Sequence, residues 1–299
     1  MTKFNTRFAP SPNGYLHLGH AFSALISEKI AAKSSGKFFL RIEDIDIGRC
    51  NKEFEKNIYE DLSWLGINYH KDVRRQSDYF KNYEVYIKKL RDLGLIYPCW
   101  ATRSEIKKEI KKKLNTLSGW PIDPDGQYIY PGIYKNISKA KRSSLMLNGS
   151  DFSWRMDIDK AIAFAEERVG ENISFNEKGL EPIGIRTLEP SLYGDFIIAR
   201  KEIPTSYHLS VTVDDAEQNI NLISRGIDLY PATSIHRLLQ IIFNFPETNW
   251  YHHNLLREEN GIKLSKTNNS TSIKSLREKG HSREEIFTMI EENQPFPNF

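Results

Sequence analysis

The chain has 299 residues and a formal net charge of +3 at pH 7. Hydrophobic residues make up 39% of it and aromatic residues 12%, which excludes a disordered chain and is enough for a substantial core. Two cysteines exclude a disulfide framework, and no stretch approaches the roughly 18 apolar residues of a membrane helix or has the pattern of a secretion signal. We therefore expect a cytoplasmic protein with no membrane partner, for which nucleic acid is a permitted partner but not a required one.

The first 95 residues alternate between predicted strands and helices. Residues 3–8 and 37–42 have strand composition, and between them a turn rich in proline and glycine leads into a helix near Gly19. Two more helical stripes follow, one that ends at Gly66 and one that begins near Ser77 and ends at Gly94. This order of elements is the opening of an α/β sheet protein.

Residues 96–189 break this rhythm, and we interpret them as an insertion. Thr102 and Glu105 have capping-box spacing and predict the start of a short helix. The helix carries five lysines, which form either a solvated face or a surface for nucleic-acid phosphates. These lysines are Lys107, Lys108, Lys111, Lys112 and Lys113.

The strand pattern resumes after the insertion. Residues 195–200, 208–215 and 221–226 predict three strands, and the apolar run 238–243 predicts a buried helix. A polar loop and a helical stretch follow Pro246.

Two short motifs carry the chemistry. His17 and His20 fall where the first turn becomes a helix, and a helix N-terminus with its free N–H groups suits a phosphate. Lys263 and Lys266 flank a hydroxyl in a polar loop and can grip a polyphosphate as point charges. Taken alone, the first motif equally fits a turn with two satisfied histidines, and the second fits a surface loop. Together they indicate a nucleotide-activating pair, although the chain has no P-loop motif.

These motifs resemble the two signatures of the class I aminoacyl-tRNA synthetases. HLGH (17–20) is similar to the family's HIGH motif and KLSKT (263–267) to its KMSKS motif, while RFAPSPNGYLHLGH and LRIEDID resemble the glutamyl and glutaminyl branch. The resemblance runs from residue 3 to about residue 280. It implies an α/β fold with a Rossmann-like parallel sheet split by an α+β insertion and a short helical C-terminal segment. The implied domains are 1–95 with 190–245, the insertion 96–189, and 246–299.

The resemblance also implies a glutamate site. A guanidinium matches a carboxylate in charge and shape, so Arg7 and Arg225 are the expected carboxylate partners. Glu43 is expected to take the substrate ammonium and Tyr207 to close the pocket, although Arg7 and Glu43 without this context also fit a buried structural ion pair. The full expected set is Arg7, Phe8, Ala9, Pro10, Ser11, Glu43, Tyr207 and Arg225.

The implied reaction is attack of the glutamate carboxylate on the α-phosphate of ATP, with release of pyrophosphate. His17 and His20 are expected to serve the α-phosphate, and Lys266, assisted by Lys263, the pyrophosphate. Gly19 joins His17, His20 and Lys266 in the expected ATP site. Magnesium is expected to arrive with ATP, held by phosphate and water oxygens, and no protein ligands for a metal are predicted.

The acceptor is inferred from the length of the chain. The sequence ends at Phe299, whereas ordinary glutamyl-tRNA synthetases continue into an anticodon-binding domain. The chain therefore resembles members of this branch that activate glutamate without tRNA and attach it to queuosine at the wobble position of tRNA(Asp). We expect it to bind the anticodon arm of that tRNA and to act as a monomer. The alternatives are a shortened glutamyl-tRNA synthetase that charges tRNA(Glu) and a synthetase-like RNA-binding protein without catalysis.

The resemblance also bears on whether the insertion binds zinc. Many relatives bind it in the insertion through Cys-x-Cys and, further on, Tyr-x3-Cys. The corresponding positions here are Cys99, Ala101, Tyr130 and Tyr134, so Ala101 and Tyr134 replace two expected cysteines. One thiol and one phenol cannot complete a tetrahedral site, and we predict no structural zinc.

Overall fold

The computed structural model describes residues 2–256 and 271–297. In this part of the chain it confirms a mixed α/β fold with parallel strands and ten α-helices. Two of its three small sheets lie edge to edge around the candidate site, and the third lies in the region of the insertion. None of the described helices combines the length and the apolar character that a membrane crossing requires.

The N-terminal part forms a parallel sheet in the order β1-β2-β3. Thr6 pairs with Phe38 in this sheet, and Arg41 pairs with Arg74. All residues of β1 and β2 are buried, including the polar Thr6, Arg7 and Arg41. The elements are β1 (Thr6–Phe8), α1 (Leu18–Lys33), β2 (Phe38–Ile42), α2 (Lys52–Trp64), β3 (Arg74–Arg75) and α3 (Phe80–Asp92).

A second sheet has the order β7-β6-β10-β9, parallel except for the outer strand β7. Its largest fully buried side chain is Trp250 on β10. The elements are β6 (Ser174–Glu177), β7 (Gly184–Thr187), α7 (Tyr207–Glu217), β9 (Leu222–Gly226), α8 (Thr233–Phe243) and β10 (Asn249–His253).

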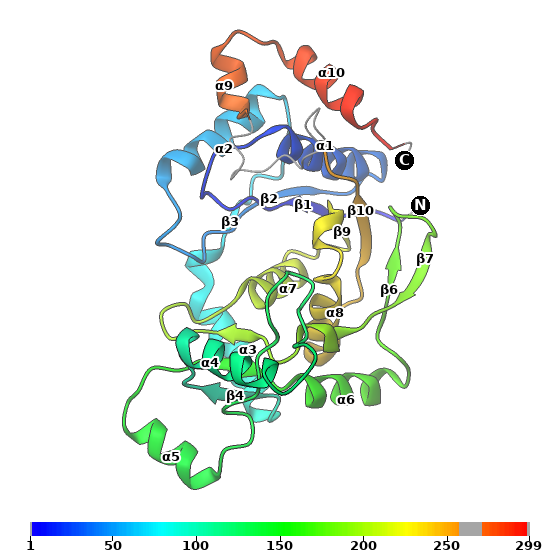
Figure 1. The fold of residues 1–299 in the computed structure, drawn as a ribbon. Coiled ribbons are helices and arrows are strands. Elements are labelled where there is room, and N and C mark those ends of the chain that lie inside the picture. The colour runs from blue at the N-terminus through cyan, green and yellow to red at the C-terminus, as the bar shows by residue number, and fades with distance from the viewer. Residues whose placement is uncertain (1, 257–270, 298–299) are drawn as a thin grey trace.

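The two sheets meet where β1 lies beside β9. The amides of Asn221 and Leu222 donate to the Asn5 carbonyl at 3.2 and 3.3 Å. From this seam the chain passes through α1 to β2 on one side and through α8 to β10 on the other, so the strand order reverses here. Figure 1 shows α1 on one face of the strands and α7 and α8 on the other. Ligands of parallel α/β sheets bind at such a reversal, beyond the carboxyl ends of the strands.

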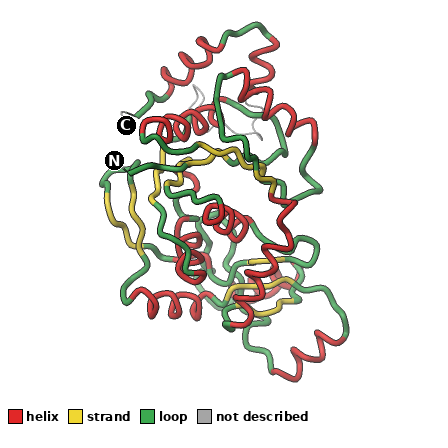
Figure 2. The backbone as a smooth tube through the Cα atoms, turned by 180° about the vertical axis from the view of Figure 1, so that it is seen from behind, coloured by secondary structure: helices red, strands yellow, loops and turns green. Residues whose placement is uncertain are grey.

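The third sheet is antiparallel, in the order β4-β5-β8. The helices α4 and α5 extend from it, at the opposite end of the molecule from the C-terminal helices (Figures 1 and 2). The strand β8 of the expected catalytic part pairs with β5 of the insertion, and β6 of the insertion pairs with β10, which falls in the expected segment 246–299. Strand pairing therefore crosses all three expected domains, and their boundaries stay a prediction. The remaining elements are β4 (Ile96–Cys99), α4 (Arg103–Leu114), α5 (Lys139–Leu147), β5 (Ser153–Met156), α6 (Ile158–Val169), β8 (Ile197–Ala199), α9 (Ile273–Glu278) and α10 (Arg283–Asn293).

The prediction of a strand at residues 208–215 is wrong, because these residues lie in helix α7. The Ser206 side chain caps the helix by accepting a hydrogen bond from the Leu209 amide. Every residue from Leu209 to Asp215 is buried, so the segment shows no amphipathic period that could separate a helix from a strand.

Candidate active site

A cavity of about 460 Å³ opens at the seam between β1 and β9. The ends of β1, β9 and β10 and the first turn of α1 line it. All predicted site residues in the described part of the chain contribute to this wall, whereas Lys263 and Lys266 lie outside the described residues. The predicted residues in the wall are Arg7, Phe8, Ala9, Pro10, Ser11, His17, Gly19, His20, Glu43, Tyr207 and Arg225.

The two histidines cap helix α1 as a pair. His17 is the N-cap residue, and its Nδ1 accepts from the Gly19 amide at 3.1 Å. The His17 amide in turn donates to Nδ1 of His20 at 3.1 Å, and the ring centroids lie 3.8 Å apart. Since both Nδ1 atoms accept, each neutral imidazole carries its proton on Nε2. The motif therefore presents two Nε2–H donors at a helix N-terminus, a combination that suits a phosphate.

The His17 ring leaves little space for a side chain at Gly19. A Cβ atom at this position would lie 3.0 Å from Cε1 and 3.1 Å from Nδ1 of His17. A side chain at this position would require the imidazole to shift by a few tenths of an ångström. Glycine at position 19 therefore leaves room for the capping ring of His17.

Arg7 is held by two acceptors on other elements. Its Nε donates to Asp215 Oδ1 at 3.0 Å, and its Nη1 donates to the Ser224 carbonyl at 3.1 Å. Arg41, which is fully buried, donates to the same Asp215 oxygen at 2.7 Å. Burial alone would raise the pKa of Asp215, but Arg41 and Arg7 together lower it. The Arg7 guanidinium is therefore anchored by a buried carboxylate that it shares with Arg41.

Glu43 extends from the end of β2, where its amide donates to the Pro10 carbonyl at 3.0 Å. Its side chain is 13% exposed and accepts from Nη2 of Arg41 at 3.3 Å. Burial raises the pKa of Glu43 to about 7, against the opposing effect of Arg41 and Arg7. A half-neutralised carboxylate on the cavity wall can complete its ionisation when an ammonium group binds.

Arg225 approaches the cavity from β9. It is buried and donates to Thr233 Oγ1 at 2.7 Å and to Nδ1 of His236 at 3.0 Å. Tyr207, the first residue of α7, lines the same wall. Burial lowers the pKa of Arg225 to about 10, so the group remains a cation at neutral pH.

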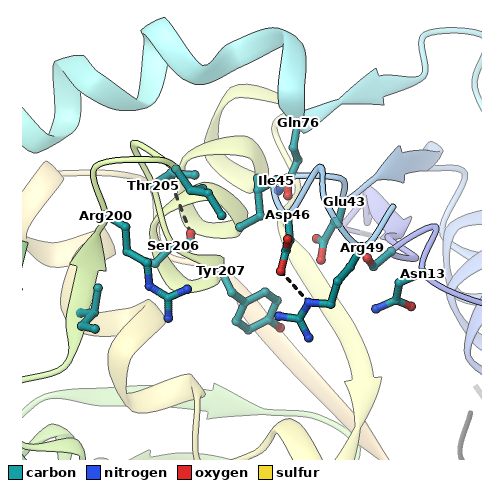
Figure 3. A pocket seen from close by; sticks show the side chains of 13 residues that line it. Asn13, Glu43, Ile45, Asp46, Arg49, Gln76, Arg200, Thr205, Ser206 and Tyr207 are labelled. Carbon is teal, nitrogen blue, oxygen red and sulfur yellow. Dashed lines mark hydrogen bonds and ion pairs between the residues drawn. The ribbon is translucent and has the colours of Figure 1, made fainter. Parts of the chain in front are cut away.

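A second cavity of about 310 Å³ adjoins the first and shares Ser11, Asn13, Glu43 and Tyr207 with it. Figure 3 shows Arg200 on one side of this second cavity and Arg49 on the other. Arg49 is exposed and pairs with Asp46 at 2.6 Å. The first cavity therefore has a neighbouring space with two guanidinium groups at its wall.

The four positions expected for zinc lie together in a small hydrophobic cluster around Cys99 and Tyr130. The Cys99 thiol donates to the Tyr130 hydroxyl at 3.3 Å, and that hydroxyl also accepts from the Tyr134 amide at 2.9 Å. Ala101 and the ring of Tyr134 pack against them. This donor set does not fit a tetrahedral zinc ion. Across residues 2–256 and 271–297, no group of three or more His, Cys, Asp or Glu side chains could hold a metal.

Several residues around the site were not predicted from the sequence. Asp215 accepts from both Arg7 and Arg41, while Thr233, His236 and His252 surround Arg225. For Asp215 a signal exists, because two carboxylates at the end of the apolar run VTVDD require buried cations as partners. The histidines carry no comparable signal, since they lie in ordinary helix and strand patterns.

Comparisons with known proteins agree with this arrangement. The family model described as the catalytic domain of class I tRNA synthetases (E and Q) matches residues 3–293. The glutamyl-Q tRNA(Asp) synthetase of Rhodobacter capsulatus is 36% identical over 289 residues, which are 95% of this chain and 99% of that protein. The glutamate–tRNA ligase of Aquifex aeolicus is 34% identical over 292 residues, which are 97% of this chain and 57% of that protein.

A solved structure supports the same fold. The glutamate–tRNA synthetase of Elizabethkingia anophelis superimposes with a TM-score of 0.78 at 20% identity, and the match covers 99% of this chain and 64% of that one. With the family model matched over nearly the whole sequence, the chain belongs to the catalytic-domain family of the class I tRNA synthetases for glutamate and glutamine.

Proposed function

We propose that the protein activates L-glutamate with ATP, without tRNA, and transfers the glutamate to queuosine at the wobble position of tRNA(Asp). The observation that carries the first step is one cavity that combines two arginines, a carboxylate and the histidine-capped helix start. The second step is supported by the Rhodobacter capsulatus relative, a glutamyl-Q tRNA(Asp) synthetase matched over 99% of its length. We propose that the protein acts as a monomer.

In the first step an oxygen of the glutamate α-carboxylate attacks the α-phosphorus of ATP. A P–O bond to the carboxylate forms, the bond to the β-phosphate bridge breaks, and glutamyl-adenylate and pyrophosphate result. No protein nucleophile is needed, so alignment and charge stabilisation supply the rate. Glu43 would hold the ammonium group of glutamate, and Arg7 and Arg225 would hold the carboxylates of glutamate.

The two histidines are the proposed partners of the ATP α-phosphate. With Nδ1 of each ring used as an acceptor, Nε2–H of His17 and His20 would donate to the α-phosphate oxygens. Magnesium would enter as part of the ATP substrate. Lys263 and Lys266, outside the described residues, are the proposed partners of the leaving pyrophosphate.

In the second step a hydroxyl of the queuosine ring would attack the adenylate carbonyl, which forms an ester and releases AMP. The second cavity offers a route for this acceptor, because it shares Glu43 and Tyr207 with the glutamate site. Arg200 and Arg49 at its wall provide charge for a neighbouring tRNA phosphate.

Isotope exchange between ATP and pyrophosphate without tRNA tests the first step. We expect exchange that depends on glutamate and is much weaker with glutamine or aspartate. Labelled glutamate should then pass to tRNA(Asp) with queuosine, and neither to the same tRNA without queuosine nor to tRNA(Glu). Charging of tRNA(Glu) would favour the glutamyl-tRNA synthetase alternative, and exchange only in the presence of tRNA would overturn tRNA-independent activation.

A single variant separates the two steps. Arg200→Ala should lower transfer to tRNA(Asp) about tenfold, the effect of losing one charged contact, while pyrophosphate exchange stays unchanged. The neighbouring Lys201, which is exposed and pairs with Asp151, gives the matched control Lys201→Ala. Equal transfer rates for both variants would remove Arg200 from the acceptor route.

A further inference from the structure

Arg225 is a buried cation whose hydrogen-bond partners are neutral side chains. Its Nη2 donates to Thr233 Oγ1 at 2.7 Å, its Nη1 to Nδ1 of His236 at 3.0 Å, and its Nε to Nε2 of His252 at 3.3 Å. The guanidinium also lies 4.6 Å from the ring centroid of Trp250. All three guanidinium nitrogens are therefore oriented, and none of these contacts neutralises the charge.

The other arginine of the cavity is held differently. Arg7 shares Asp215 with Arg41, whereas no carboxylate in the described part of the chain lies within ion-pair distance of Arg225. A buried charge without a counter-ion is costly, and an anion that enters the site removes this cost. Neutral partners orient the guanidinium without competing with that anion.

Glu177 fixes the imidazole of His252 in the required tautomer. Oε1 of Glu177 accepts from four backbone amides, and Oε2 lies 2.5 Å from Nδ1 of His252. The carboxylate thus keeps the proton on Nδ1 and leaves Nε2 as an acceptor, for Arg225 Nε at 3.3 Å and for the Thr233 hydroxyl at 3.2 Å. Burial lowers the pKa of His252 to about 4, although Glu177 opposes this shift, so the ring is neutral at physiological pH.

His236 is oriented in the same way by His208. Nδ1 of His236 accepts from Arg225, so its proton lies on Nε2, which is 3.1 Å from Nδ1 of His208. Burial lowers the pKa of both rings, and the charge of Arg225 lowers it further. Trp250 stacks on both His236 and His252, with interplanar angles of 18° and 3°, and holds the rings in place.

We propose that Thr233, His236 and His252 are positioning residues that hold Arg225 for the side-chain carboxylate of glutamate. Nη1 and Nη2 of the guanidinium donate one hydrogen each to His236 and Thr233, which leaves further N–H hydrogens for the substrate carboxylate. Because the three partners are neutral, the substrate carboxylate becomes the counter-ion of Arg225. A carboxamide carries no charge, so the same arrangement selects glutamate over glutamine. The proposal rests on the proposed glutamate activation.

Thr233→Val tests the proposal, since it removes the shortest of the three bonds with little change of shape. We expect the KM for glutamate in pyrophosphate exchange to rise about tenfold or more, as for loss of a hydrogen bond to a charged group. The kcat and the KM for ATP should stay nearly unchanged, because Arg225 does not touch the reacting atoms. Thr233→Ser should restore the wild-type KM. Thr248→Val is the matched control, since Thr248 is also buried and accepts one side-chain N–H, from Gln240.

Glu177→Gln is an independent second variant that does not touch Arg225. Its Oε1 can keep the four backbone bonds, while its amide N–H₂ faces Nδ1 of His252 and favours the tautomer with the proton directed at Arg225. The KM for glutamate should again rise, and the preference for glutamate over glutamine should fall in both variants. Thermal melting checks that each variant folds.

The outcomes separate the two proposals. A wild-type protein that shows no glutamate-dependent exchange contradicts the proposed function itself. A wild-type protein that is active, with folded Thr233→Val and Glu177→Gln variants of unchanged glutamate KM and selectivity, overturns the positioning role alone.

Discussion

The guanidinium of Arg7 donates through Nε to Asp215 Oδ1 at 3.0 Å and so ties β1 to α7, 208 residues further along the chain. Arg41 donates to the same oxygen at 2.7 Å. One carboxylate oxygen therefore fixes an arginine on the cavity wall and the arginine that contacts Glu43. The geometry of the proposed glutamate site therefore depends on Asp215.

Asp215→Asn should destabilise the protein by about 3–5 kcal/mol, because it leaves two buried guanidinium groups without their shared charge. Urea denaturation measures the loss, and pyrophosphate exchange should show a raised KM for glutamate. Asp92→Asn is the control, since Asp92 is half exposed and its removal should cost no more than about 0.5 kcal/mol. Similar stability of the two variants would show that Asp215 does not hold the site.

Glu43 makes glutamate activation dependent on pH. Its pKa of about 7 means that the ligand-free protein gains a proton on this group as the pH falls from 8 to 6. The protonated form cannot pair with the substrate ammonium, so we expect the KM for glutamate to rise over this range. Glu43→Gln should lack this pH dependence and show a high KM throughout. A wild-type KM that is constant between pH 6 and 8 would contradict the assignment.

The same shift predicts an effect on stability. The pKa of Glu43 is raised in the folded state above its ordinary value of 4.5, so the folded protein binds more protons between about pH 4.5 and 7. This contribution to stability is complete below pH 4.5 and is lost as the pH rises through 7. Glu43→Gln should therefore be more stable than the wild type at pH 8. The difference should narrow at pH 5, and urea denaturation at both pH values measures it.

Local rules predicted the parts of the fold that have a clear period or punctuation. The capping box at Thr102 and Glu105 starts α4, and the strand at 221–226 contains β9. The strand β10 was not predicted, because its sequence NWYHH has neither strict alternation nor a run of β-branched residues. Its pairing with β9 over five residues provides what the local sequence lacks.

The residues of the candidate site likewise fall into those that local sequence predicts and those that it does not. The histidine turn and Glu43 were found because their motifs lie in short, continuous stretches of sequence. The partners of Arg7 and Arg225 were not found, because Asp215 and His252 reach the cavity only through contacts distant in sequence. Such partners follow from topology, which a local pattern does not contain.

Helix α4 predicts how tRNA binding should depend on salt. Lys107 and Lys111 are exposed one turn apart, and none of the helix's lysines has a carboxylate within ion-pair distance in the described part of the chain. If both contact phosphates, Lys107→Gln with Lys111→Gln should reduce the slope of log K against log salt by about 1.4 to 1.8. The control replaces Lys52 and Lys56, an exposed pair with the same spacing on α2, of which Lys56 also lies 3.5 Å from Glu60. Equal slopes for the two double variants would make the α4 lysines a solvated face.

The cluster around Cys99 and Tyr130 allows a direct test of the zinc prediction. One thiol hydrogen-bonded to one phenol supplies only half of a tetrahedral donor set. Elemental analysis of the purified protein should therefore find far less than one zinc per chain. A chelator should leave pyrophosphate exchange unchanged. Ala101 and Tyr134 pack against this pair, so Ala101→Cys with Tyr134→Cys would place three thiols beside the Tyr130 hydroxyl. We expect this double variant to bind zinc and to gain thermal stability when zinc is added, since metal binding stabilises the folded state that holds the ligands. One equivalent of zinc in the wild-type protein would contradict the prediction, because its ligands would then have to come from residues other than these four.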